Sequence, residues 1–335
     1  MEKTFNCPIC NNSSWEQIGK MAYNSKDHRE GTIIFNDRYT LLRRKILFNI
    51  WIPGSDSIDF QSQYCSSCYF ACYSPRPNSI DIRKKYEFLQ DKEKYIGAPK
   101  SQSKKTIYLE NKRSKKYFHL LKRYGFSKSD TILDVGGGDG RHLLPFYKKE
   151  FKCYVIDYNK YPINGITRLG STLNHIPHRL KFNYILCTHV LEHVAEPVKF
   201  LKKMIGNLKD DGLCYVEVPS EIWYDIKWDP VTHINFFTKA SLANTIVHSG
   251  FDLITIKKAI GSYGNKRILI IWALIRKSAR KSQKLISGKE EIRKLITPNY
   301  FSILKRRFYE MRTNNSLKPM FRLIKQILRK IKNTF

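Results

Sequence analysis

The segment Thr131-Ile-Leu-Asp-Val-Gly-Gly-Gly-Asp-Gly140 is the part of the chain best suited to hold a ligand. Its apolar run predicts a buried strand, and its glycines predict a tight turn that leads into a helix. Glycine has no Cβ, so the backbone of such a turn can approach a ligand closely. A dinucleotide fingerprint starting at Gly136 would need glycine at position 141, where Arg141 stands. The pattern is instead G-x-G-x-G, formed by Gly136, Gly138 and Gly140, with Asp134 just upstream.

A second acid follows the next predicted strand. The segment 152–157 is a short apolar run that ends in Asp157. A carboxylate at this place in a Rossmann-like fold can accept hydrogen bonds from both hydroxyls of a ribose. We therefore expect Asp134 and Asp157 to lie at one ligand site; the alternative is that both are solvated turn residues.

Three further side chains that could do chemistry follow the buried strand 182–188. His189, Glu192 and His193 are expected at the carboxyl edge of the sheet, where doubly wound sheets bind ligands. His233 lies in an aromatic-rich loop, 223–237, whose rings could stack on a sugar or roof a pocket. Histidine suits acid–base chemistry near neutral pH, so His233 is the best candidate for a general base or an acceptor contact. Glu192 could instead anchor the loop, and His193 could be a structural, hydrogen-bonded residue.

Four of the eight cysteines form two C-x-x-C pairs, Cys7 with Cys10 and Cys65 with Cys68. Each pair can supply two thiolates to a tetrahedral zinc ion, and four thiolates leave no position for a catalytic water. The gap of 54 residues between the pairs exceeds the usual spacing of about 15–20 and requires an inserted segment. We expect structural zinc rather than unmetallated thiols. The other cysteines are spare or buried in predicted strands: Cys72, Cys153, Cys187 and Cys214.

Strands and helices alternate through the second half of the chain. This alternation predicts an α/β fold with a Rossmann-like, doubly wound, mostly parallel seven-stranded sheet. A turn is expected at 209–212, and Thr238 is expected to cap a helix through His248. The clearest strands are 131–135, 152–157, 182–188, 213–219, 251–256 and 267–274, with a helix at 197–208.

Three parts of the chain resemble the class I S-adenosylmethionine (SAM) methyltransferases of the ubiquinone and sugar type. They are the glycine motif, the segment Leu191-Glu-His-Val194 followed by Glu196-Pro-Val-Lys-Phe-Leu201, and the segment His233-Ile-Asn-Phe-Phe237. The resemblance covers about residues 127–275. It implies that the glycine loop cradles the amino-acid part of SAM, with Asp134 near the ammonium group and Asp157 on the ribose. His189 is assigned to the same cofactor site. The family's acid that contacts adenine has no counterpart in 170–177, and Asn174 is expected to take its place.

The cysteine pairs, together with Pro75-Arg-Pro77 and Tyr86, are similar to the zinc-binding N-terminal module of bacterial sugar and surface-glycan methyltransferases. That resemblance implies a structural zinc and a module that helps to cover the substrate. The expected division is a zinc module at 1–80, linker helices at 81–126, a methyltransferase domain at 127–275 and a basic helical tail at 276–335.

The formal net charge of +31 is concentrated in the tail, which holds 18 Lys or Arg residues against 3 Glu. Apolar residues at helical spacing, Met320, Ile324, Ile327 and Ile331, predict a basic amphipathic helix. Such a helix suits an anionic membrane surface. Packing on the catalytic domain and contact with nucleic acid are the alternatives.

These features predict a SAM-dependent methyltransferase acting on a sugar nucleotide or a lipid-linked surface-glycan intermediate. With no apolar leader after Met1 and no run of 18 apolar residues, we expect it in the cytoplasm, peripheral on the inner face of the cytoplasmic membrane. An RNA methyltransferase, with the zinc module and the tail on RNA, is the first alternative. Against this alternative, the chain has no Asn-Pro-Pro-Tyr-like motif after the strand 182–188. A non-catalytic polyanion-binding protein is the second.

Overall fold

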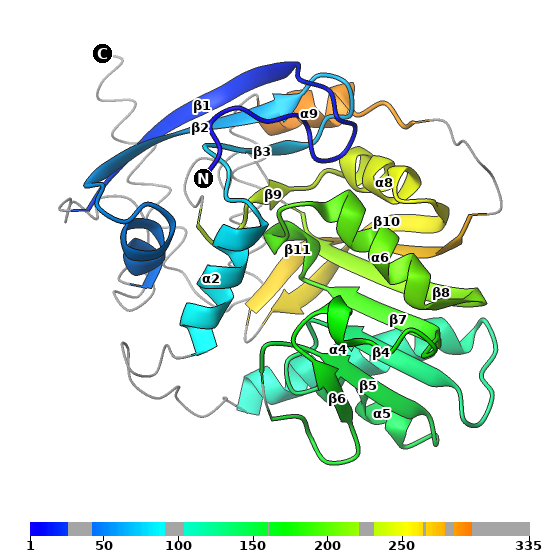
Figure 1. The fold of residues 1–335 in the computed structure, drawn as a ribbon. Helices are drawn as coiled ribbons and strands as arrows, with labels where there is room; N and C mark the ends of the chain where they lie inside the picture. The colour runs from blue at the N-terminus through cyan, green and yellow to red at the C-terminus, as the bar shows by residue number, and fades with distance from the viewer. Residues whose placement is uncertain are drawn as a thin grey trace.

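Side chains that alternate between two apolar faces build a seven-stranded sheet, seen in the lower half of Figure 1. The computed structural model describes residues 1–25, 42–90, 104–159, 161–220, 231–263, 266–278 and 285–296. The strand order is β10-β11-β8-β7-β4-β5-β6, in which the five strands from β8 to β6 are parallel and β11 is antiparallel to both neighbours. The predicted Rossmann-like sheet is thus confirmed. Its strands are β4 (Thr131–Val135), β5 (Lys152–Ile156), β6 (Thr167–Gly170), β7 (Phe182–Thr188), β8 (Leu208–Pro219), β10 (Phe251–Tyr263) and β11 (Lys266–Lys277).

Helices cover both faces of this sheet. On one face, α6 (Pro197–Asn207) and α8 (Lys239–His248) pack through Leu201 and Leu242. On the other, α4 (Lys104–Lys122) contributes Tyr117, beside the 3₁₀ turn η2 (Arg141–Leu143) and the short helix α5 (Leu144–Tyr147). The expected cap of α8 is present, because Thr238 Oγ1 accepts a hydrogen bond from the Ser241 amide at 3.1 Å. Because helices cover both faces, the central strands β4 and β7 are buried along almost their whole length.

Two local expectations need correction. The predicted turn at 209–212 lies within β8, which already begins at Leu208. The ladder with β7 shifts register there, from Phe182 opposite Leu208 to Tyr184 opposite Leu213, so the intervening residues bulge out of the strand. The final hairpin is also longer than predicted. The three strand cysteines, Cys153, Cys187 and Cys214, are buried as expected.

A second sheet carries the N-terminal cysteines and lies at the top of Figure 1. It has four strands in the order β1-β2-β3-β9, all antiparallel: β1 (Trp15–Asn24), β2 (Ser57–Cys65), β3 (Ala71–Ser74) and β9 (Asn235–Phe236). The π-helix η1 (Lys45–Trp51) and the helix α2 (Ser79–Gln90) pack beside it. Since β9 lies within the expected methyltransferase range of 127–275, the small sheet takes one of its strands from that range. The expected domain boundaries stay predictions.

The beginning of the tail is docked on α8. The helix α9 (Lys289–Ile296) places Ile292 in the core of the small sheet, and Glu291 Oε2 accepts a hydrogen bond from the Ala240 amide at 2.8 Å. The predicted basic helix around Met320–Ile331 lies outside the described residues. None of the helices in the described part of the chain has the length and apolar character needed to cross a membrane.

Candidate functional site

The glycine loop follows β4 and has an open side. Gly136 has a positive φ of 69°, and a Cβ there would lie 2.5 Å from Val190 Cγ2, so only glycine fits. Gly138 also has a positive φ, of 61°, but a Cβ there would meet nothing within 4 Å. Its amide donates a hydrogen bond to Asp157 Oδ2 at 2.9 Å. The loop therefore leaves space at Gly138, directly beside the acid that the sequence predicts to bind a ribose.

The carboxylate of Asp157 is half-buried and well placed for hydroxyl donors. Its second oxygen, Oδ1, accepts a hydrogen bond from the Asn159 amide at 2.7 Å. Each carboxylate oxygen has a further lone pair, so two hydroxyls can still be accepted. Asn174, the predicted adenine contact, is exposed on the 3₁₀ turn η3 (Leu173–His175) that follows β6. The arrangement fits the ribose of SAM, while the adenine contact stays a prediction.

Asp134 lies beneath the loop instead of in its open side. Its side chain is fully buried, and a Cβ at Gly137 would lie 2.3 Å from its Cγ. Neither carboxylate oxygen has a hydrogen-bond partner in the described structure, although His142 Nδ1 lies 3.6 Å from Oδ2. Burial raises the pKa of Asp134, and the nearby His142 opposes that rise. The predicted contact with the SAM ammonium stays a prediction, and the structure adds His142, which the sequence gave no reason to select.

Glu192, His193 and His233 come together after β7. Their possible ligand atoms all lie within 4.8 Å of one another, close enough to bind one cation together. His193 Nδ1 lies 2.7 Å from the carbonyl oxygen of Thr232, so this nitrogen must carry the proton and donate it. His193 Nε2 is then unprotonated in the neutral ring, 3.9 Å from Glu192 Oε1. The backbone joins the same segments, because the Ile234 amide donates to the Glu192 carbonyl at 2.9 Å.

Burial favours the neutral form of a histidine in this cluster, and a neutral imidazole can act as a base. Burial lowers the pKa of His193 well below the usual value, and the adjacent His233 and Lys85 act in the same direction. Two expected neighbours are placed differently: Phe236 and Phe237 are each 1% exposed and pack in the core, so they cannot stack on a sugar. The remaining aromatic residues of that loop, at 221–230, lie outside the described residues.

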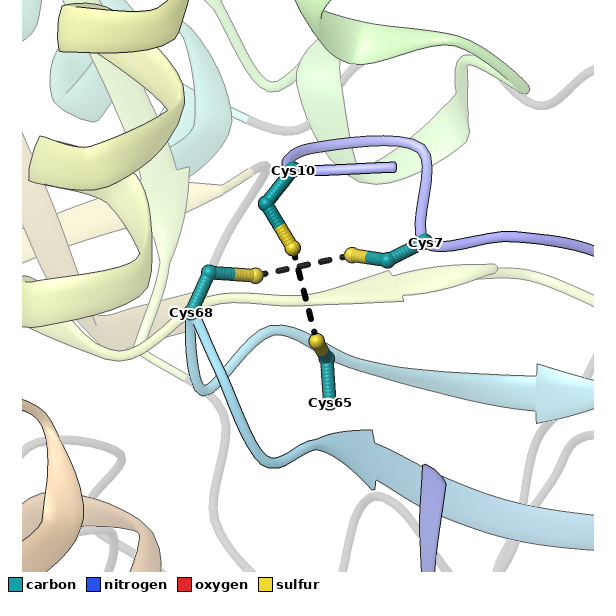
Figure 2. Close-up of side chains that lie close together, drawn as sticks. All are labelled: Cys7, Cys10, Cys65 and Cys68. Carbon is teal, nitrogen blue, oxygen red and sulfur yellow. Dashed lines mark hydrogen bonds between the residues drawn. The ribbon is translucent and has the colours of Figure 1, made fainter. Parts of the chain in front are cut away.

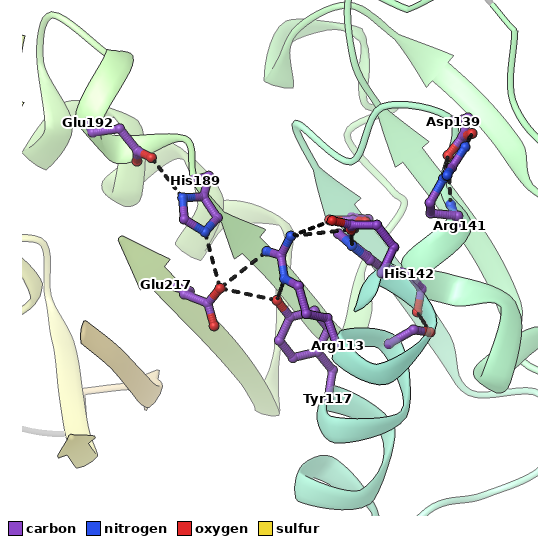
Figure 3. A network of polar contacts seen from close by, with 11 residues as sticks. Arg113, Tyr117, Asp139, Arg141, His142, His189, Glu192 and Glu217 are labelled. Atoms are coloured by element: carbon purple, nitrogen blue, oxygen red, sulfur yellow. Dashed lines mark hydrogen bonds and ion pairs between the residues drawn. The ribbon is translucent and has the colours of Figure 1, made fainter. Parts of the chain in front are cut away.

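His189 is enclosed by carboxylates, as Figure 3 shows. Its Nδ1 lies 3.2 Å from Glu192 Oε1 and its Nε2 lies 3.3 Å from Glu217 Oε1. Its φ of 57° is rare for a residue other than glycine, and such strain is common at functional sites. Because both ring nitrogens of His189 face acids, only the carbon atoms of the ring could contact a cofactor. The assignment of His189 to the cofactor site stays a prediction.

Glu217 and Arg113 extend the network away from His189, and the sequence interpretation missed both. Arg113 Nη2 lies 3.2 Å from Glu217 Oε1 (Figure 3). Tyr215 donates to Glu217 Oε2 at 2.7 Å. Burial opposes ionisation of Glu217, but the hydrogen bond with His189 and the charge of Arg113 together lower its pKa to about 2. The available signal was a glutamate inside the apolar strand 213–219. This buried carboxylate joins α4 to the ends of β7 and β8.

Replacing Glu217 by glutamine is expected to lower the free energy of unfolding by about 3–5 kcal/mol at pH 7, because Arg113 would lose its buried partner. The carboxylate pKa is about 2 in the folded chain against an ordinary value of 4.5, so its contribution to stability is present above pH 4.5 and disappears as the pH falls toward 2. Urea unfolding from pH 7 to pH 3 measures both effects. The exposed Glu150, changed to glutamine, is the control and should shift stability by less than about 1 kcal/mol. Equal pH slopes in the two variants would contradict the assignment.

The four predicted metal ligands surround one point (Figure 2). Cys7 Sγ lies 3.5 Å from Cys68 Sγ, and Cys10 Sγ lies 3.5 Å from Cys65 Sγ. Zinc–sulfur bonds of about 2.3 Å give a tetrahedron with edges of about 3.8 Å, close to these separations. The hydrogen bond from Cys7 lowers the pKa of Cys10 to about 7, and that from Cys68 lowers the pKa of Cys65 to about 2. The hydrogen bonds within the cluster conversely raise the pKa values of Cys7 and Cys68. The geometry therefore fits a four-thiolate metal site, whereas Cys72 is buried outside it.

Comparison with known proteins identifies a methyltransferase domain around the glycine loop. A protein-family model described as "Methyltransferase domain" matches residues 108–256, which hold the glycine loop, Asp157 and the Glu192–His193–His233 cluster. A ubiquinone biosynthesis O-methyltransferase of Rickettsia felis is 27% identical over 96 residues, or 25% of this chain and 39% of that protein. This chain thus covers well under two thirds of that relative's length.

Solved structures of methyltransferases are also similar. The 1,6-didemethyltoxoflavin N1-methyltransferase of Burkholderia thailandensis, solved with S-adenosylhomocysteine, is 14% identical, with a TM-score of 0.43, over 64% of this chain and 98% of its own. A SAM-dependent methyltransferase of Methanosarcina mazei is 15% identical, with a TM-score of 0.40, over 48% of this chain and 98% of its own.

Proposed function

We propose that this class I SAM-dependent methyltransferase transfers a methyl group to a sugar nucleotide or a lipid-linked glycan intermediate at the inner face of the cytoplasmic membrane. One observation carries the catalytic part of the proposal. The side chain of Val190 fills the space beside Gly136, so the glycine loop touches the segment that carries Glu192 and His193. The cofactor cradle and the histidine cluster are therefore two parts of one site.

Different residues have different roles in a methylation of oxygen or nitrogen. Bound SAM supplies an electrophilic methyl group. Gly138 and Asp157 hold the cofactor side, and His233 accepts the proton that the acceptor group loses. Glu192, 1% exposed, has one carboxylate oxygen without a partner in the described structure and can stabilise the resulting imidazolium. Holding both reactants in one geometry can contribute roughly 7–11 kcal/mol to such a reaction.

The N-terminal sheet supports a structural role for zinc and a role in covering the acceptor. Cys7, Cys65 and Cys68 belong to the same hydrophobic cluster as Leu133 of β4, so a metal there would stabilise the packing of the two sheets. We assign zinc to the four thiolates for this reason. The strongly basic segment from residue 276 onward suits an anionic membrane, or the phosphates of a lipid-linked acceptor.

The test is transfer of labelled methyl from SAM into a fractionated extract of source cells that lack this protein. We expect label in the glycan or organic-extractable fraction. Label that ribonuclease removes would overturn the glycan assignment in favour of RNA. The matched control is His233→Gln, which should bind S-adenosylhomocysteine like the unchanged protein but transfer no label above background.

A further inference from the structure

Three cations from the first 90 residues hold the short segment that carries His233. Arg43 Nε donates to Thr232 Oγ1 at 2.9 Å, and Lys85 Nζ donates to the Val231 carbonyl at 2.7 Å. Arg76 Nη1 donates to the Ile234 carbonyl at 3.0 Å. Contacts on both sides of His233 in the sequence therefore come from the N-terminal part of the chain.

Arg76 also reaches the other half of the histidine cluster. Its Nη2 donates to the Ala195 carbonyl at 2.8 Å and to the amide oxygen of Asn235. The amide nitrogen of Asn235 then donates to the carbonyls of Leu191 and Val194, at 2.6 and 2.8 Å. One guanidinium and one amide thus tie residues 234–235 to residues 191–195, the segment that contains Glu192 and His193.

The free-energy cost of burying the charges of Arg76 and Lys85 argues against a role in packing alone. Arg76 is 4% exposed, lies between the rings of Phe5 and Phe70, and has no carboxylate partner in the described part of the chain. A buried charge without a counterion is costly, and a neutral donor could satisfy a carbonyl at lower cost. Lys85 is 5% exposed and also acts on carbonyl oxygens. The rigid fork of arginine can hold several carbonyls in fixed relative positions, which suits an element that sets distances.

The same helix reaches the cofactor side. Tyr86, next to Lys85 on α2, stacks on Tyr158 with centroids 4.9 Å apart and planes at 8°. Tyr158 directly follows Asp157. Thus α2 contacts both the proposed base segment and the proposed ribose-binding segment.

We propose that Arg76 and Lys85 are positioning residues that set His233 against Glu192 and His193, so that residues 1–90 form part of the catalytic apparatus and not only a cover over it. This inference rests on the proposed function for its link to methyl transfer. The contacts themselves predict the placement of the histidines whatever the acceptor is.

The experiment compares Lys85→Met with Arg83→Met, a matched control on the same helix whose cation is 63% exposed. A misplacement of about 1 Å can cost about a hundredfold in rate, so we expect Lys85→Met to slow methyl transfer at saturating SAM by at least about tenfold. Affinity for S-adenosylhomocysteine, measured by calorimetry, should stay within about twofold of the unchanged protein. Arg76→Lys, which keeps the charge but not the fork, is the second variant and should show the same pattern.

Histidine NMR gives a readout that needs no substrate. The ring signals of His193 and His233 should move in Lys85→Met and Arg76→Lys, whereas those of the distant His119 and His175 should not. Transfer rates equal to that of Arg83→Met, with unmoved His233 signals, would overturn the inference. If the unchanged protein binds no S-adenosylhomocysteine, the proposed function fails, and the NMR comparison still decides the positioning role.

Discussion

Replacing Asp157 by alanine is expected to weaken binding of SAM and S-adenosylhomocysteine by at least about a hundredfold while the protein stays folded. Hydrogen bonds to a charged group contribute about 1.5–3 kcal/mol each, and two ribose hydroxyls would be lost together. The Gly138 amide would also lose its acceptor, so the open side of the loop would be less well defined. Isothermal calorimetry with S-adenosylhomocysteine measures the effect directly.

Asp157→Asn is the matched control for this result. The amide oxygen can still accept the bond from Gly138, but the negative charge is gone, so an intermediate loss of affinity is expected. Thermal unfolding in the absence of ligand should be similar in both variants, since the carboxylate is half-buried and lies at the end of β5. Affinity unchanged in Asp157→Ala would refute the assignment of this acid to the ribose.

Loss of the metal should have the largest effect on stability. Structural zinc contributes about 10–16 kcal/mol to the folding of small zinc peptides. Three of the four cysteines here lie in the core shared by both sheets, and Cys10 packs against it. Even if half of that free energy is retained by packing, Cys65→Ser should lower the melting temperature by at least about 10 °C. Thermal unfolding together with a zinc assay on the purified protein measures this.

The control for metal loss is Cys72→Ala, which removes a buried thiol from the same sheet without touching the cluster. It should keep one zinc per chain and lose only the few kcal/mol of a small core substitution. Purification without chelator must precede both assays. Protein that then contains no zinc would remove the four-thiolate site from further consideration.

The parts of the fold that were predictable from sequence are those with a local cause. The strand Thr131–Val135 and the glycine turn after it depend on a single apolar run and on backbone freedom, both readable in ten residues. The cap at Thr238 is equally local. By contrast, β9 is two residues long, and its place in the small sheet depends on a partner more than 150 residues earlier. No local pattern could have revealed it.

The candidate site likewise has residues that the sequence could indicate and residues that it could not. Asp157, Glu192 and His193 follow strands and were identified by position, whereas their grouping with His233 became visible only in the structure. Arg76, Lys85 and Arg113 were missed, because a buried cation cannot be distinguished from a surface cation in a chain with 60 Lys and Arg residues. Their roles depend on carbonyls and acids that only the tertiary structure brings near.

The late strand β9 also sets an order for biosynthesis. The ribosome releases all four clustered cysteines and β1–β3 long before Asn235 and Phe236 leave the exit tunnel. Until then β3 is an open edge, and open edges are templates for pairing with other chains. The edge of β3 in the nascent N-terminal sheet therefore stays unpaired while about half of the chain is translated. It is paired only when β9, which follows His233, has been synthesised.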